Sequence, residues 1–262
     1  MGEEKEIPEQ EKRPANKSEA VITIKGLKKS FGKKDVLKDI TLTVNRGENV
    51  VILGRSGTGK SVTIQCIVGL LMPDGGTLKV LGDEVSGMNE NELKELRMKV
   101  GFLFQSGALY DSMTVRENLE FPLTRVLKLD DQNEIDKRVE EVLESVGLTD
   151  AIDKLPSDLS GGMRKRAGLA RTLIIRPEIM LYDEPTTGLD PITSREISEL
   201  ILNMQKKYKT SSIIITHDME CARITSDRVL IMDDGKYIAE GTFNELHKSK
   251  DKLVKSYFID IS

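Results

Sequence analysis

The sequence contains no long apolar run, and this absence limits what the chain can be. No segment approaches the roughly 18 consecutive apolar residues that a membrane-spanning helix needs. The first twenty residues mix charges with proline and lack the apolar stretch of a secretory signal peptide. We therefore predict a disordered tail over residues 1–20 and a folded domain over residues 21–262.

The chain also has only two cysteines and no net positive charge. The two cysteines, Cys66 and Cys221, are far apart and match no metal-ligand spacing, which favours buried, reduced thiols over a redox or metal role. The net charge of −4 argues against a dedicated nucleic-acid binder, because such proteins are usually basic. The 262 residues are enough for one large domain or two lobes that share a core.

Short apolar runs of strand length recur along the chain, and several lack alternation, as expected for strands buried on both faces. They cover residues 21–26, 36–44, 49–53, 77–81, 100–104, 179–183 and 212–216. Residues 228–241 are typical of a hairpin that turns at Asp234 and Gly235. Helical patterns lie between the strands, so the predicted fold class is α/β.

One region breaks this alternation. From about Asp111 to Leu159 there is no clear strand, and apolar residues recur at helical spacing over 133–147, ending at Gly147. We predict a helical subdomain over roughly residues 106–165. Residues 246–262 form a C-terminal tail, to whose His247 we assign no role.

The segment 54–61, "GRSGTGKS", follows an apolar strand and precedes a helical pattern, which is the context of a phosphate-binding P-loop. Its glycines let successive backbone N–H groups point at phosphate oxygens, and the helix N-terminus adds partial positive charge. Lys60 would reach the β- and γ-phosphates and Ser61 would ligate Mg²⁺. The nucleotide-binding residues are Gly54, Arg55, Ser56, Gly57, Thr58, Gly59, Lys60 and Ser61. The alternative is a glycine-rich turn without a ligand.

Polar residues follow three other buried runs. Asp183 and Glu184 end the run 179–183, where Asp183 would hold Mg²⁺ and Glu184 would take a proton from the attacking water. His217 follows 212–216 and could reach the γ-phosphate. Gln105 follows 100–104 and could touch the water or Mg²⁺. The alternative for each is a solvated or structural polar residue at a strand end.

The segment 159–171, "LSGGMRKRAGLAR", presents a contradiction. Ser160 fits a helix N-cap, yet two glycines occupy the first turn, where each costs about 1 kcal/mol relative to alanine. Residues 164–166 then place three cations near the positive end of the helix dipole. Such a helix start needs a compensating interaction.

The order of these motifs resembles that of an ATP-binding cassette (ABC) ATPase over roughly residues 20–245. The resemblance implies a RecA-like core, an antiparallel β-subdomain and an inserted α-helical subdomain, with ATP and Mg²⁺ as cofactors. It makes Phe31 the A-loop aromatic, Gln105 the Q-loop residue and His217 the switch histidine. The signature is 159–163, where Met163 replaces the usual glutamine, and the D-loop is 187–190, with Asp190.

In this family two cassettes pack head to tail, so the resemblance implies a homodimer. Ser160, Gly161 and Gly162 of one copy would then contact the γ-phosphate bound by the other. That anion would offset the repulsion between the dipole and the cations of 164–166.

The resemblance implies an ATP-hydrolysing subunit of a transporter, peripheral at the cytoplasmic face of the inner membrane, with a separate multi-span permease. Residues 106–123 together with 159–173 resemble ATPases of Mla/MCE-type systems, which move phospholipids in diderm bacteria and include an MCE-domain protein. The alternative is the ATPase of a polar amino-acid or other small-solute importer. A soluble ABC ATPase of DNA repair, translation or iron–sulfur assembly is the second class.

The stretch 104–123 begins the helical insert, on which a permease would rest. Val115, Leu119 and Leu123 have the spacing of ordinary helix packing. Tyr110, Met113 and Phe121 are large apolar groups in a chain with only 4% aromatics, so they either pack the insert or face a partner.

Overall fold

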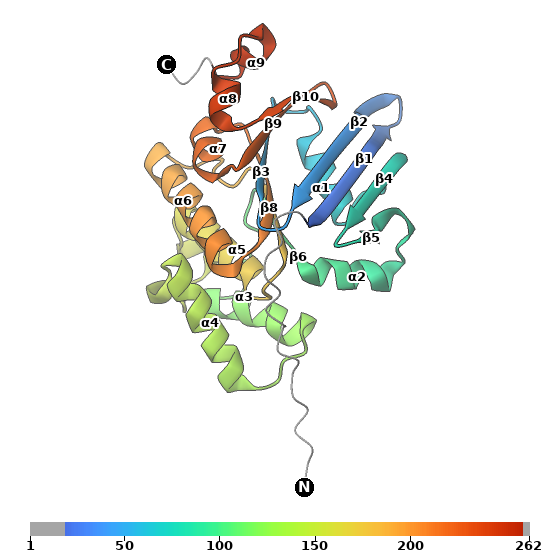
Figure 1. Cartoon of the computed structure of the whole chain (residues 1–262). Helices are drawn as coiled ribbons and strands as arrows, with labels where there is room; N and C mark the ends of the chain where they lie inside the picture. Colours follow the sequence, from blue (N-terminus) through green and yellow to red (C-terminus); the bar gives the residue numbers. More distant parts are fainter. Residues whose placement is uncertain (1–18, 259–262) are drawn as a thin grey trace.

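The computed structural model describes residues 19–258 and contains two sheets flanked by helices (Figure 1). The strands are β1 (Ala20–Phe31), β2 (Lys34–Asn45), β3 (Asn49–Leu53), β4 (Gly75–Val80), β5 (Asp83–Glu84), β6 (Val100–Leu103), β7 (Ile179–Asp183), β8 (Ser211–Thr216), β9 (Arg228–Asp233) and β10 (Lys236–Gly241). The α-helices are α1 (Lys60–Ile67), α2 (Glu90–Lys99), α3 (Val115–Phe121), α4 (Gln132–Val146), α5 (Gly161–Leu173), α6 (Pro191–Tyr208), α7 (Met219–Thr225), α8 (Phe243–His247) and α9 (Lys252–Ser256).

The predicted N-terminal tail lies mostly outside the described residues. Its last residue, Ala20, already belongs to β1, and Glu19 is held by a salt bridge of 2.9 Å to Arg46. The first strand therefore begins one residue before the predicted domain boundary, and this ion pair anchors its start. No helix within residues 19–258 combines the length and the apolar character that crossing a bilayer requires.

The central sheet has the strand order β10-β9-β3-β8-β7-β6, and only β10 is antiparallel to its neighbour. Successive residues of the parallel strands enter two different cores. In β3, Val50 and Ile52 face the core shared with α1, α2 and the second sheet, whereas Val51 and Leu53 face the core shared with α3 to α7. Burial on both faces explains why the sequence runs are apolar without alternation.

The second sheet is antiparallel, with the order β2-β1-β4-β5. The long β1–β2 hairpin contains register shifts, and the short strand β5 was not predicted. The predicted hairpin over 228–241 is confirmed. Its turn residues, Asp234 and Gly235, have φ angles of 42° and 75°, as a tight turn between right-twisted strands requires.

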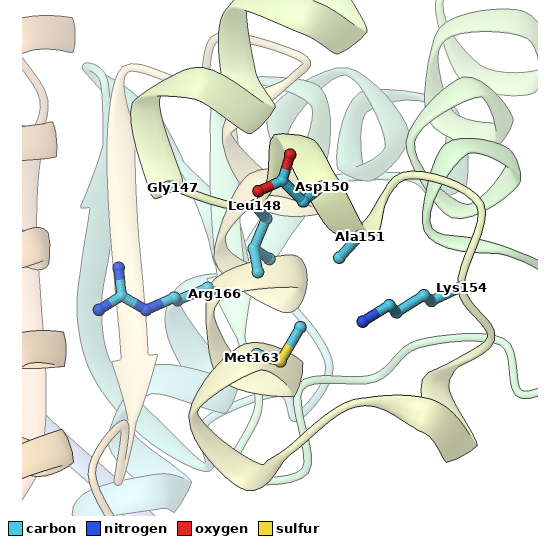
Figure 2. Close-up of a pocket in the computed structure, with 7 residues that line it drawn as sticks. All are labelled: Gly147, Leu148, Asp150, Ala151, Lys154, Met163 and Arg166. Atoms are coloured by element: carbon cyan, nitrogen blue, oxygen red, sulfur yellow. The ribbon is translucent and has the colours of Figure 1, made fainter.

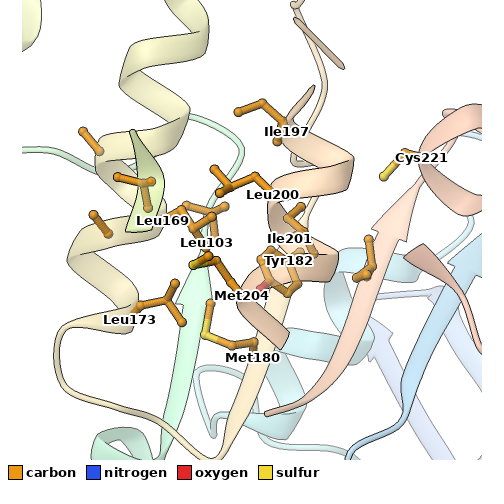
Figure 3. Close-up of a cluster of buried hydrophobic side chains, with 14 of the residues drawn as sticks. Leu103, Leu169, Leu173, Met180, Tyr182, Ile197, Leu200, Ile201, Met204 and Cys221 are labelled. Atoms are coloured by element: carbon orange, nitrogen blue, oxygen red, sulfur yellow. The ribbon is translucent and has the colours of Figure 1, made fainter. Parts of the chain in front are cut away.

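Between β6 and β7 the chain is helical. It forms α3, a π-helical turn at Pro122–Val126, α4 and α5. The predicted packing residues Val115, Leu119 and Leu123 are all buried. Leu169 and Leu173 in the second half of α5 pack with residues of β6, β7 and α6 (Figure 3), so the central sheet positions this helix.

Both cysteines are buried and free, as the sequence predicts. Burial raises the pKa of the Cys66 thiol to about 11 and that of the Cys221 thiol to about 12. Because the thiolate is the nucleophile, neither thiol should react with a thiol reagent near pH 8 in the native protein. Titration with a chromogenic disulfide should detect no thiol before denaturation and both thiols after it. Rapid modification of the folded protein would contradict the described packing.

Candidate nucleotide site

The P-loop connects β3 to α1 and can be built only with glycine at two positions. Gly59 has a φ of 107° and caps α1. A Cβ on Gly59 would lie 2.8 Å from Cδ2 of Leu37, and a Cβ on Gly54 would lie 2.6 Å from the carbonyl oxygen of Met232. The loop backbone is therefore packed closely against Leu37 and Met232. Backbone N–H groups on its solvent-facing side would suit a phosphate.

Lys60 lies under this loop. Its Nζ donates to the carbonyl oxygens of Gly54 at 2.6 Å and Arg55 at 3.0 Å, and lies 3.9 Å from Oε1 of Glu184. Burial lowers the pKa of Lys60, while Glu184 and Asp183 act in the opposite direction. The ammonium group is thus held under the loop by two carbonyl oxygens, with Glu184 as a more distant ion-pair partner.

Ser61 and Asp183 are 122 positions apart in the sequence and meet at the carboxyl edge of the sheet. The Ser61 hydroxyl donates to Oδ1 of Asp183 at 2.9 Å. Burial raises the pKa of Asp183, and the Ser61 bond opposes that shift. A hydroxyl beside a carboxylate is an oxygen donor set that fits Mg²⁺. Gln105 is exposed at the end of β6.

Glu184 directly follows β7 and has a φ of 51°, which is unusual for a residue other than glycine. Its amide donates to the carbonyl of Ile215 in β8 at 2.9 Å. Its Oε2 lies 2.8 Å from Nδ1 of His217 and accepts a weaker bond from the Thr187 hydroxyl at 3.3 Å. Only 15% of the Glu184 side chain is exposed. Its carboxylate is held in the site by His217, which follows β8, and by Thr187, which follows β7.

Three residues that contribute to this site were not identified from the sequence. The Thr186 hydroxyl donates to Oδ2 of Asp218 at 2.9 Å, which joins the segments after β7 and β8. Lys165 donates to the carbonyl oxygens of Gln105 at 2.5 Å and Glu184 at 3.4 Å. A sequence signal existed for Lys165, because it lies three residues from Gly162 and from Gly168 and thus on the apolar face of α5.

The start of α5 contacts the D-loop and α6. Ser160 caps the helix by accepting from the amide of Met163 at 3.3 Å. A Cβ on Gly161 would lie 3.2 Å from Leu189, and a Cβ on Gly162 would lie 2.6 Å from Thr193. Gly162 is therefore required for packing within the chain, whatever it binds outside it, whereas a small shift of the Leu189 side chain would admit a Cβ at Gly161.

The three cations of 164–166 do not share one environment. Arg164 donates to the carbonyl of Leu159 at 2.6 Å, and Arg166 donates to the carbonyl of Val146 at 3.0 Å and to Glu196 at 3.0 Å. Together with the contacts of Lys165, these bonds offset part of the repulsion that the sequence suggested. An external anion is not the only compensation.

Asp190 and Phe31 have local roles in the described structure. Asp190 caps α6 by accepting hydrogen bonds from the amides of Ile192 and Thr193. The hydrogen bond from the Thr193 hydroxyl, followed by the bonds from the amides, lowers the pKa of Asp190. Phe31 ends β1 and is 47% exposed. Their roles toward a nucleotide remain predictions.

A hollow of about 410 Å³ lies in the helical region and not at the P-loop (Figure 2). Its lining residues are Gly147, Leu148, Asp150, Ala151, Lys154, Met163 and Arg166. Met163 and Arg166 of α5 therefore face the segment 147–154 that follows α4, whereas Lys165 reaches the strand ends.

Comparison with known proteins identifies the family to which this chain belongs. Residues 37–187 match the family described as ABC transporter. The chain is 41% identical over 224 residues to a methionine import ATP-binding protein of Rhizobium johnstonii, covering 86% of this chain and 61% of that protein. It is 38% identical over 259 residues to the chloroplastic protein TRIGALACTOSYLDIACYLGLYCEROL 3 of Arabidopsis thaliana, covering 92% of this chain and 74% of that protein. The chain thus spans about three fifths of the length of the methionine import relative.

A solved structure shows the same arrangement. It is an ATP-binding cassette in a dimeric, post-hydrolysis state bound to ADP and Pi, with 31% sequence identity and a TM-score of 0.77. The match covers 85% of this chain and 98% of that one. The predicted fold class is confirmed.

Proposed function

Because this chain belongs to the ABC transporter family, we propose that it is the ATP-hydrolysing subunit of a transporter whose permease is a separate protein. The observation that supports this most is the convergence of Lys60, Glu184 and His217 at one edge of the sheet. The P-loop supplies phosphate binding, and the neighbouring strand ends supply a carboxylate and an imidazole.

In this proposal the chain's own residues perform the chemistry of hydrolysis. Lys60 and the amides of the P-loop bind the β- and γ-phosphates. Ser61 and Asp183 would hold Mg²⁺, which when bound neutralises phosphate charge. Glu184 accepts the proton of the attacking water, and His217 orients that carboxylate through the 2.8 Å contact.

The proposed working unit is a head-to-tail homodimer at the cytoplasmic face of the inner membrane. The start of α5 packs on the D-loop and α6 of its own chain, so its outer side is available to a nucleotide held by a second copy. Ile192, which follows Asp190, is 75% exposed, an apolar surface that a second copy would cover. The similar structure in the post-hydrolysis state is a dimer.

For the transported substrate we propose a phospholipid, carried by a permease together with an MCE-domain protein. The resemblance of 106–123 and 159–173 to Mla/MCE-type ATPases supports this, and one relative is named after a glycerolipid. The alternative is a small-solute importer, which the methionine import relative favours. The proposal includes no nucleic-acid partner.

The surface that would meet the permease follows β6 and is shaped by one buried residue. Asn118 accepts from the amide of Tyr110 at 2.8 Å and donates to the carbonyl oxygens of Tyr110, Met113 and Thr114 at 3.0–3.1 Å. This network folds 110–114 into a compact loop. It leaves the Tyr110 ring 42% exposed, against Phe121 at 5.0 Å and the Arg171 guanidinium at 4.9 Å.

The double substitution Tyr110→Glu and Met113→Glu should prevent this ATPase from binding its membrane subunit. Both residues lie on the loop held by Asn118, and carboxylates would place charge on a surface meant for an apolar interface core. Co-purification with the permease and ATP-dependent phospholipid movement in proteoliposomes should be lost. The ATPase activity of the isolated chain and its melting temperature should remain.

Ile238→Glu is a matched control. Ile238 is 38% exposed and lies on β10, at the opposite edge of the central sheet from β6. It should leave complex formation intact. Normal lipid movement by the double variant would place the coupling surface elsewhere. An intact complex that responds to a soluble amino acid and moves no lipid would favour the importer.

A further inference from the structure

Lys165 is a lysine on the buried face of a helix. Its side chain is 7% exposed, and Gly162, Gly168 and Leu169 share that face of α5. Burial lowers the pKa of Lys165, while the charges of Glu184 and Asp183 act in the opposite direction. A buried cation needs partners, and here they are two backbone carbonyls and two nearby carboxylates.

The carbonyl partners of Lys165 belong to the catalytic strand ends. One is Gln105, just after β6, and the other is Glu184, just after β7, at 2.5 Å and 3.4 Å from Nζ. A single ammonium group of α5 thus joins the main chain of the predicted Q-loop residue to that of the predicted general base.

Two further contacts hold the same helix against the segment after Gln105. A Cβ on Gly168 would lie 2.7 Å from the carbonyl oxygen of Gly107, so that backbone segment lies directly on α5. The Arg171 guanidinium donates to the carbonyl of Ala108 at 3.1 Å. Because residues 165, 168 and 171 recur every third position, they lie on one side of the helix.

The charge at this point is balanced only if Lys165 is counted. Asp183 and Glu184 are two carboxylates in a half-buried site, and Lys60 is one cation. Lys165 supplies the second cation. Removing it would leave the two carboxylates with a single cation, and would also leave the Gln105 carbonyl without its charged donor.

We propose that Lys165 is a positioning residue that fixes Gln105 and Glu184 to α5 of the same chain, the helix whose start carries the signature residues 159–163. In the proposed dimer this helix starts at the nucleotide of the other site. Lys165 therefore links the γ-phosphate contact of one site to the catalytic carboxylate of the other. This inference rests on the proposed ATP-hydrolysing function.

The proposal predicts a separation of turnover from binding. Lys165→Met keeps the unbranched apolar stem of the side chain but removes its terminal ammonium group and its charge. It should lower kcat about 10- to 100-fold, since misplacement of a catalytic group by about 1 Å has an effect of this size. The Kd for ATP, measured with a fluorescent analogue, should change less than about threefold, because the P-loop is untouched. Lys165→Arg should recover part of kcat.

Arg166→Met is the matched control in the same helix. Arg166 also donates to a backbone carbonyl, that of Val146, but it lines the hollow of the helical region (Figure 2). It should lower the melting temperature while keeping kcat per folded molecule near wild type. Gly168→Ala tests the same junction without changing charge, because its methyl group would displace residue 107, and it should lower kcat with little change in Kd.

The outcomes separate this inference from the proposed function. A wild-type chain that hydrolyses ATP, with a wild-type kcat in the folded Lys165→Met variant, would overturn the inference alone. A wild-type chain without hydrolysis would overturn both. Equal losses of kcat in Lys165→Met and Arg166→Met, with no recovery in Lys165→Arg, would reduce Lys165 to a packing residue. If Lys165→Met does not fold, a wild-type kcat in Gly168→Ala overturns the positioning role and a reduced kcat supports it.

Discussion

Replacing Glu184 with glutamine should leave ATP bound while lowering hydrolysis by about 10²–10⁴-fold, the usual effect of removing a general base. The amide has the same shape as the carboxylate and can keep the 2.8 Å contact to Nδ1 of His217. The P-loop, with Lys60 beneath it, is not altered. We therefore expect the variant to bind ATP normally and to accumulate as an ATP-bound dimer.

Steady-state phosphate release, nucleotide affinity and size-exclusion chromatography with ATP test this expectation. Lys60→Ala is the contrasting variant. It removes the cation that Gly54 and Arg55 hold at the loop, so it should abolish nucleotide binding itself. Wild-type turnover in Glu184→Gln would assign the base to another group, and His217 would be the next candidate. Tight ATP binding by Lys60→Ala would contradict the P-loop assignment.

The parts of this site that the sequence predicted are those encoded by short contiguous patterns. The P-loop is eight consecutive residues, 54–61, whose glycines define the backbone path. Asp183 and His217 each end an apolar run, and parallel strands bring such ends to one edge of the sheet. The strand order β3-β8-β7 then places them beside the P-loop.

The parts that could not be predicted depend on contacts between distant segments. The 60 positions between Lys165 and Gln105 are bridged only because α5 packs over the end of β6. Thr186 and Asp218 likewise meet because β7 and β8 are neighbours. Residues 164–166 form one basic cluster in the sequence, yet each of their side chains contacts a different set of partners. Helical spacing shows which residues lie on the same side of a helix, but the contacts of that side depend on how the helix packs in the fold.

The start of α5 leads to the second large effect. If Ser160 acts on a nucleotide bound by another copy, a Ser160→Arg homodimer and a Lys60→Ala homodimer should both be inactive. Ser160 is exposed, and loss of its cap to the Met163 amide costs about 1 kcal/mol, which a domain of this size tolerates. The arginine would fill the space that the γ-phosphate needs and would leave the chain's own P-loop intact.

Mixing the two variants should then restore hydrolysis. In a head-to-tail heterodimer one site carries both substitutions, while the other combines the intact P-loop of the Ser160→Arg chain with the intact Ser160 of the Lys60→Ala chain. Half of the dimers in an equal mixture are hetero and each has one intact site, so recovery is limited to about a quarter of wild-type turnover. Unmixed variants measured at the same total concentration are the control. Full hydrolysis by a demonstrably monomeric chain, or by Ser160→Arg alone, would show that each copy completes its own site.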